Sequence, residues 1–221
     1  MTVVPFLFGI LDGAVTPLAI PAPAGQICFQ MGDDNQLISA IATITDDPSE
    51  TIVVGALDVI SADSYHRPII RFDVSVLPPG TLVISATLTL TMLSGTISGT
   101  QTFTCARVTQ LGWIDSQSTW DNYKTATAWV AGGGDYTLTD SDTTVLTASQ
   151  DLIFDGIGNM TKYILDYDAG IFNCVCFGDA LNTGPPQFLE LASFDHATPH
   201  LRPWLCIEYT LVPSPAQAIV C

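Results

Sequence analysis

A strand, a proline-glycine turn and a second strand are written into residues 67–92, and this unit constrains the fold more than any other part of the chain. Residues 67–74 are mostly apolar, and Leu77-Pro78-Pro79-Gly80 then supplies the residue types that turns require. The next run alternates, with Ile84, Ala86, Leu88, Leu90 and Met92 on one face and Val83, Ser85, Thr87, Thr89 and Thr91 on the other. This period of two predicts a strand with one buried face.

Further short strands are indicated by alternating or β-branched runs bounded by turn residues. They are expected within residues 38–44, 51–54, 102–109, 145–154, 172–177, 188–192 and 204–211. One helix is predicted where Met160, Tyr163, Ile164 and Tyr167 recur at helical spacing, with Gly170 closing it. We therefore expect an all-β protein, an antiparallel two-sheet jelly-roll sandwich with one short helix and extended N- and C-terminal arms.

A long irregular stretch interrupts the strand pattern between residues 111 and 144. It contains Gly132-Gly133-Gly134 and most of the tryptophans. Loops of this length inside a compact domain are usually functional or packed on a partner. The stretch is therefore the first place to look for a binding surface.

The charge balance limits the partners of the chain. Its 221 residues carry 22 acidic side chains against 6 Lys and Arg, for a formal net charge of −16. Such a surface repels phosphate backbones and anionic lipid head groups, so neither nucleic acid nor a membrane is a predicted partner. The apolar residues 3–24 are broken by four prolines, which excludes a spanning helix, and they lack the basic start of a secretory signal.

Four segments in order resemble the DNRLRE class of jelly-roll modules, a family grouped with carbohydrate-binding modules. They are the Arg71-Phe72-Asp73 strand with its Leu77–Gly80 turn, the segment from Trp113 to Asn122, the helix near Tyr163 and the closing strand from Arg202 to Tyr209. The resemblance covers residues 36–211. It implies a two-sheet sandwich of a kind found in secreted polysaccharide-active proteins, surface proteins and some viral structural proteins.

The resemblance also implies structural roles for two aromatic residues. Trp113 and Trp120 are expected to be core residues that pin the irregular stretch to the sandwich. Arg71 and Arg202 each lie inside an apolar strand, so we expect a buried guanidinium paired with a carboxylate, and Asp73 belongs to the same structural set.

Two kinds of ligand site have candidates. Sugar faces stack on aromatic rings, and Tyr123, Trp129 and Tyr136 are the candidate platforms in the irregular stretch. Calcium prefers oxygen ligands, which Asp33 with Asp34 and Asp140 with Asp142 offer in predicted loops. No other cofactor is predicted.

Catalysis is not expected. His66, His196 and His200 are the only histidines, and each is predicted to lie in a loop, where solvation or capping suits it better than general-base work. Ser64, which precedes Tyr65 and His66, lacks the glycine elbow of a hydrolase nucleophile.

The six cysteines have no C-x-x-C pair and no histidine at metal-ligand spacing, which argues against a zinc site. Cys105, Cys174, Cys176 and Cys206 are interpreted as small apolar strand residues, with Cys174 and Cys176 on one face. Cys28 and Cys221 lie near the chain ends and are the candidates for disulfides between subunits.

The two ends of the chain are apolar and contain several prolines. We divide the chain into an N-terminal arm (1–25), a sandwich domain (26–212) and a C-terminal tail (213–221). Free apolar arms favour aggregation unless protein covers them, so both are expected to lie against neighbouring subunits. The alternative is that they fold back on their own sandwich.

These features lead to a non-enzymatic assembly subunit as the main functional hypothesis. Its most specific form is a decoration or cement protein on a bacteriophage virion surface, bound through residues 1–25 and 213–221 to copies of itself and to a major capsid or other particle protein. Two alternatives remain open: an extracellular carbohydrate-binding or adhesion module, and a subunit of an extracellular filament assembled by strand donation.

Overall fold

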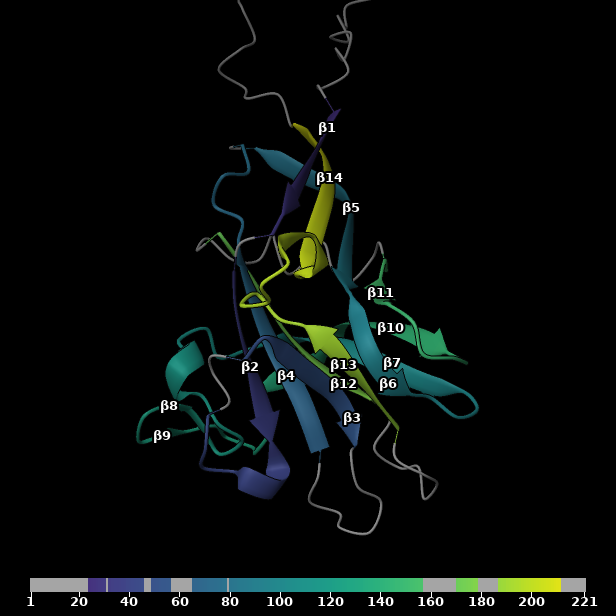
Figure 1. Ribbon diagram of the computed structural model, residues 1–221. Helices are drawn as coiled ribbons and strands as arrows, with labels where there is room; N and C mark the ends of the chain where they lie inside the picture. The colour runs from purple at the N-terminus through teal and green to yellow at the C-terminus, as the bar shows by residue number, and fades with distance from the viewer. Residues whose placement is uncertain are drawn as a thin grey trace, which may run out of the picture.

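The computed structural model describes residues 24–30, 32–45, 49–56, 65–78, 80–156, 170–178 and 187–211. These residues form two antiparallel sheets and a small hairpin (Figure 1). The smaller sheet has the order β1-β14-β5-β11. Its strands are β1 (Ala24–Phe29), β5 (Thr81–Leu90), β11 (Leu152–Phe154) and β14 (Trp204–Leu211).

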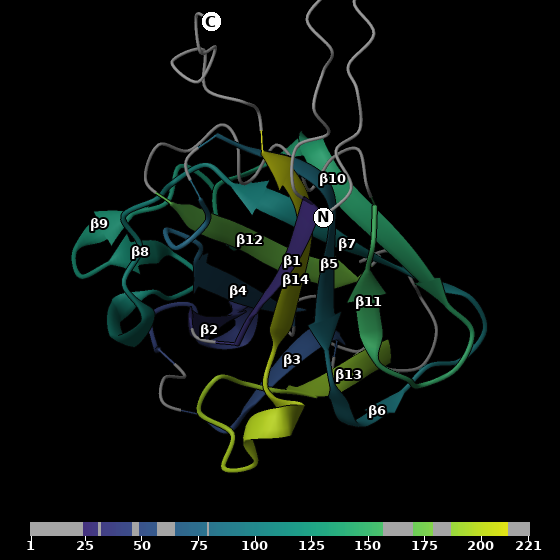
Figure 2. The same ribbon diagram turned by 90° about the horizontal axis from the view of Figure 1, so that it is seen from above.

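The larger sheet has the order β10-β7-β12-β4-β3-β13-β6, and β2 pairs with β4 beside this path. Its strands are β2 (Gly32–Ile38), β3 (Thr51–Ala56), β4 (Tyr65–Asp73), β6 (Met92–Thr96), β7 (Gln101–Val108), β10 (Tyr136–Leu146), β12 (Ile171–Gly178) and β13 (Gln187–Ala192). The hairpin consists of β8 (Asn122–Lys124) and β9 (Thr127–Ala128). Seen from above, the strands of the smaller sheet run across those of the larger one (Figure 2).

The predicted jelly-roll sandwich is confirmed by the strand order. If β1, β4, β5, β7, β10, β11, β12 and β14 are numbered along the chain, they run 1-8-3-6 in the smaller sheet and 2-7-4-5 in the larger. This order winds a long antiparallel ribbon into two facing sheets. The predicted helix at residues 160–167 lies outside the described residues, which contain short 3₁₀ turns but no α-helix. No helix within the described residues has the length and apolarity needed to cross a membrane.

The main core lies between the two sheets. The smaller sheet contributes Leu88, Leu90, Leu152, Phe154 and Leu205, and the larger contributes a matching set that includes Ile70, Phe72, Phe172 and Leu191. Phe72 packs edge-on against Phe172 and Phe194, with ring centroids 5.9 Å and 5.1 Å away. Alternation in each strand therefore delivers one face to a common apolar layer.

The alternation in β5 shifts at one point. Ala86, Leu88 and Leu90 are buried as predicted, but Val83 is buried and Ile84 is exposed, the reverse of the simple pattern. The register explains this reversal, because Glu208 pairs with Ser85 while Tyr209 pairs with Val83, leaving Ile84 as the extra residue of a bulge. A bulge changes which face the following residues occupy.

A second apolar cluster covers the other face of the larger sheet. Leu37, Ile69, Val108 and Val175 project from the sheet and pack with Trp113 and Trp129 from the segment that follows β7. The larger sheet is thus buried on both faces. The predicted irregular stretch is shorter than expected, because β10 begins at Tyr136, and it packs on its own sheet.

Three other expectations need correction at their boundaries. Strand β2 ends at Ile38 and a 3₁₀ turn follows, so the alternation read in residues 38–44 is not a strand. The strand expected at 145–154 is the end of β10 and the separate β11. Ala24 and Gly25, assigned to the N-terminal arm, belong to β1, while residues 1–23 and 212–221 lie outside the described residues.

His66 was expected in a loop but lies buried in β4. Its Nδ1 contacts the Nε2 of Gln36, which also accepts the backbone N–H of Val53 through Oε1 at 3.1 Å. Burial lowers the pKa of His66 from 6.5 to about 4. The histidine is therefore a neutral member of a buried polar pair rather than a solvated loop residue.

This burial predicts an acid-sensitive contribution to stability. Since the folded pKa lies below the unfolded one, the contribution is complete above pH 6.5 and is lost as the pH falls towards about 4. In the variant His66→Gln the free energy of unfolding, measured by urea denaturation, should change less between pH 7 and about pH 5. The exposed His200→Gln is the matched control, and an unchanged pH slope in His66→Gln would contradict the assignment.

Candidate functional site

The outer face of β4 holds the segment 109–135 in place. Alternation along the strand puts Arg67, Ile69 and Arg71 on this face, and Ile69 belongs to the outer cluster. The two arginines are part of a total of only 6 Lys and Arg in the chain. Both are committed to contacts with the segment that covers the sheet.

Arg71 joins three parts of the fold. Its Nε donates to Asp33 Oδ2 on β2 at 3.0 Å, a second nitrogen contacts the same oxygen, and Nη1 donates to the carbonyl oxygen of Trp113 at 3.1 Å. The guanidinium also lies 4.6 Å from the centre of the Trp113 ring. Trp113 Nε1 in turn donates to Asn173 Oδ1 on β12 at 2.7 Å. Arg71 pairs with a carboxylate as expected, but its side chain is 23% exposed, so the expectation of a buried guanidinium is wrong. Trp113 is a core residue as predicted.

Arg67 lies four residues before Arg71 on the same face of β4 and makes similar contacts, and sequence reasoning missed it. Its guanidinium lies 4.9 Å from the ring of Trp120 and 5.3 Å from that of Phe177, and Nη1 donates to the carbonyl of Gly133 at 3.3 Å. Gly133 has a φ of +83°, and a Cβ there would lie 2.7 Å from Arg67 Nη1. The glycine run thus lets the backbone approach the stacked pair.

The predicted sugar platforms do not form an exposed aromatic surface. Trp129 is 5% exposed, donates its Nε1 to the carbonyl of Thr119 at 2.8 Å and packs near Tyr123, so the assignment of Trp129 as a platform is wrong. Tyr123 and Tyr136 are half-buried and pack against the same outer cluster. These rings pack on the apolar residues of the outer face because that contact removes apolar surface from water. Trp120, expected in the core, packs against the cluster without being fully buried.

The predicted calcium ligands are not brought together in the described part of the chain. Asp33 pairs with Arg71, whereas Asp34 is buried and accepts the backbone N–H of Phe194 at 2.7 Å. Neighbouring residues of a strand point to opposite faces, which separates these two carboxylates. Asp142 accepts the N–H of Gly156 at 2.7 Å, and the side chain of Asp140 lies outside the described residues.

The remaining structural residues are near the ends of strands. Asp73 is exposed at the end of β4, and hydrogen bonds from Ser75 lower the pKa of its carboxyl. Arg202 donates Nε to the carbonyl oxygen of His196 at 2.8 Å, a backbone partner in place of the expected carboxylate. Neither residue is part of a convergent catalytic group.

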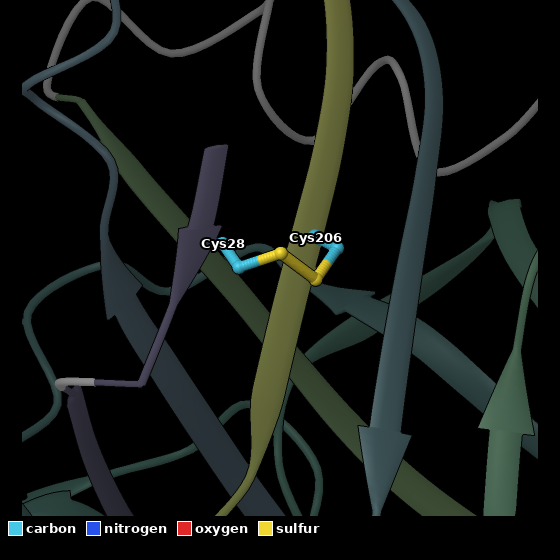
Figure 3. The surroundings of a disulfide bond; sticks show 2 residues. All are labelled: Cys28 and Cys206. Carbon is cyan, nitrogen blue, oxygen red and sulfur yellow. A yellow bond between two sulfur atoms is a disulfide. The ribbon is translucent and has the colours of Figure 1, made fainter. Parts of the chain in front are cut away.

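The two terminal strands are joined covalently. In the antiparallel pairing of β1 with β14, Cys28 lies opposite Cys206, and their sulfurs form a disulfide on the solvent-facing side of the smaller sheet (Figure 3). The prediction that Cys28 links subunits is therefore wrong, and so is the interpretation of Cys206 as a simple apolar residue. Cys221 lies outside the described residues, and its cross-link stays a prediction.

A cavity of about 690 Å³ opens beside this disulfide. It lies between the end of β1, the start of β2 and the end of β4, and its lining includes Cys28, Gln30, Asp33, Arg71, Asp73 and Val76. The Asp33–Arg71 ion pair forms part of the wall, so its charges are already neutralised by each other. The cavity offers a concave surface and polar groups. Among the described residues that line it, no nucleophile contacts a base.

Comparison with known proteins adds no family assignment. The chain matches no protein-family model and no curated protein. The resemblance to DNRLRE-class modules therefore stays a prediction.

Replacement of Arg71 by lysine should lower the free energy of unfolding by about 1–3 kcal/mol, because an ammonium cannot donate to Asp33 and Trp113 while stacking on the ring. Urea denaturation followed by tryptophan fluorescence measures the loss. Asp33→Asn removes only the charge of a half-exposed partner and should cost less, about 0–1 kcal/mol. Equal stabilities of wild type and Arg71→Lys would contradict the role of the guanidinium.

The double variant Cys28→Ser/Cys206→Ser should lose roughly 2–4 kcal/mol of stability, because the disulfide restricts a long loop of the unfolded chain. Cys221→Ser is the control and should leave the stability of the monomer unchanged. Peptide mapping without reductant should find residues 28 and 206 linked within the monomer band. A link found only in a dimer band would show that the pairing is between chains.

Proposed function

We propose that the protein is a non-enzymatic structural subunit that attaches to a larger particle through its terminal segments and displays its jelly-roll body. The most specific form of the proposal is a decoration or cement protein on the surface of a bacteriophage capsid. Its partners are then copies of itself and a major capsid or other particle protein. The virion surface is the corresponding location.

The proposal rests on one observation, which is that the two terminal segments start next to each other in space. Ala24 pairs with Thr210, so the start of β1 and the end of β14 lie side by side. Residues 1–23 and 212–221 therefore continue the chain from the same end of the smaller sheet. Two apolar segments with one origin can engage a single neighbouring surface while the rest of the sandwich points away from it.

The disulfide strengthens the attachment of β1, from which the N-terminal segment starts, to the rest of the sheet. Force applied to the N-terminal segment reaches β1, which is an edge strand within the described residues. The Cys28–Cys206 bond transmits that force to β14, which is hydrogen-bonded on both sides. An edge strand would otherwise be the first strand to peel from the sheet. The covalent link suits a subunit that must stay attached under load.

The outer face of the smaller sheet supports a contact with protein. Leu82, Ile84 and Ile153 are large apolar residues on this face, and each is more than 40% exposed. Leu82 and Ile84 lie at the end of β5 that pairs with the end of β14, and exposed apolar side chains beside one another are typical of interaction sites. The net charge of −16 favours a soluble, displayed body and disfavours binding to nucleic acid.

The carbohydrate-binding alternative has less support. Jelly rolls include lectin domains as well as viral capsid domains, so the fold serves both functions equally. The difference lies in the aromatic residues, because Trp129 is buried and the two tyrosines pack on the outer cluster. Of the three predicted platform rings, only the two half-buried tyrosines are left, which weakens this alternative.

Deletion of residues 1–23 should abolish assembly while leaving the body folded. The full chain is expected to sediment as higher-order assemblies, or with particles from the producing culture, and the shortened chain as a monomer. Near-ultraviolet circular dichroism controls for folding of the sandwich. Immunogold labelling of particles with antibody to the body locates the subunit. A full chain that is monomeric and absent from every particle would overturn the proposal.

A further inference from the structure

Three thiols meet in the core between the two sheets. Cys105 comes from β7, and Cys174 and Cys176 come from the neighbouring strand β12. Cys105 and Cys176 are directly opposite in the antiparallel register, and Cys174 is two residues along on the same face. The three sulfur atoms all lie within 4.8 Å of one another. We name this group the thiol cluster.

The surroundings of the thiol cluster are apolar and closed. Each of the three cysteines is 0% exposed, and all belong to the main core. Burial raises the pKa of the Cys105 and Cys174 thiols, while hydrogen bonds from these two lower the pKa of Cys176.

We propose that Cys105, Cys174 and Cys176 form a binding site for a soft monovalent metal ion, Cu(I), inside the sandwich. Metal–thiolate bonds of about 2.3 Å place three sulfurs around one ion about 4 Å apart, a spacing that the cluster already approaches. Soft sulfur ligands select Cu(I) among the common ions. Structural zinc requires four ligands, and within the described residues no fourth His, Cys, Asp or Glu joins the group.

The charge balance suits a monovalent ion. When Cu(I) binds the protonated cluster, one thiol loses its proton to solvent and forms a Cu–thiolate bond, and the other two sulfurs coordinate as neutral thiols, so the occupied site carries no net charge. A divalent ion with the same single deprotonation would leave a positive charge in an apolar core, which is costly. Loss of a second proton would make the site anionic. A cation is then close by, because the register places Arg107 opposite Cys174 on the same face. Asp142 lies opposite Cys105, where it accepts the N–H of Gly156.

The closed site implies that the ion enters while the chain folds. The test therefore refolds the full, disulfide-intact chain from urea under anaerobic conditions, with Cu(I) presented as its bicinchoninate complex. The absorbance of that complex reports transfer of copper to the protein. We expect transfer of one copper ion per chain and an X-ray absorption spectrum with sulfur as the only type of ligand.

Three variants identify the ligands. Cys105→Val and Cys176→Val keep an apolar side chain in the core and should reduce bound copper to background. Cys28→Ser/Cys206→Ser removes two other cysteines and should retain the copper. Because the wild-type spectrum does not depend on any variant, nitrogen or oxygen ligands in it would overturn the proposal even if the core variants fail to fold.

Two further outcomes with the wild-type chain would also overturn the proposal. One is the absence of copper transfer to the refolded wild-type chain, as judged against bicinchoninate alone. The other is a Cys105–Cys176 disulfide in the native protein, found by peptide mapping without reductant, because an oxidised pair has no thiolate to offer. Copper bound equally by wild type and Cys105→Val would place the ion elsewhere and exclude the thiol cluster.

Discussion

The stacking of Arg71 on Trp113 is the interaction on which the outer half of the molecule depends. The larger sheet has apolar residues on both faces, and only one face is covered by the smaller sheet. The other face needs a cover, and the chain supplies an irregular segment that has little regular structure of its own. Arg71 fixes this segment by bonding to Asp33 on β2 and to the Trp113 carbonyl at 3.1 Å. Asn35 adds a bond to the Ser118 carbonyl at 2.8 Å, so β2 and β4 together hold the cover.

Much of this arrangement can be predicted from local sequence patterns. The rest depends on which strands pair over long distances in the sequence. The alternation at Ala86, Leu88 and Leu90 predicts β5 because one face of that strand is buried. Strand β2 was missed because Gly32, Asp33, Asp34 and Asn35 have low strand propensity, and long-range partners bury three of the following positions. Trp129 was misplaced for a similar reason, since a ring in an irregular segment is exposed or buried according to the sheet beneath it. The Cys28–Cys206 pair requires the β1–β14 register, which no local pattern contains.

The proposed attachment and the proposed metal site use opposite sides of the smaller sheet. Its solvent-facing side carries the disulfide and the exposed residues Leu82 and Ile84, and Leu82 pairs with Thr210 where the terminal segments begin. Its inner side packs on the core that contains the thiol cluster. The thiols themselves come from β7 and β12 of the larger sheet, so a particle contact on the outside leaves the inner site untouched.

The contrast between the two groups of cysteines follows from access. Cys28 is exposed, so an oxidant or a thiol exchange catalyst can reach its sulfur, and its partner in the register lies beside it. Cys105 and Cys176 are also opposite one another, yet both are 0% exposed. Thiol chemistry requires both a thiolate and contact with the reagent, and the closed core denies the second. Folding therefore separates one pair that oxidises from three thiols that stay reduced, and reduced thiols are what a soft metal ion requires.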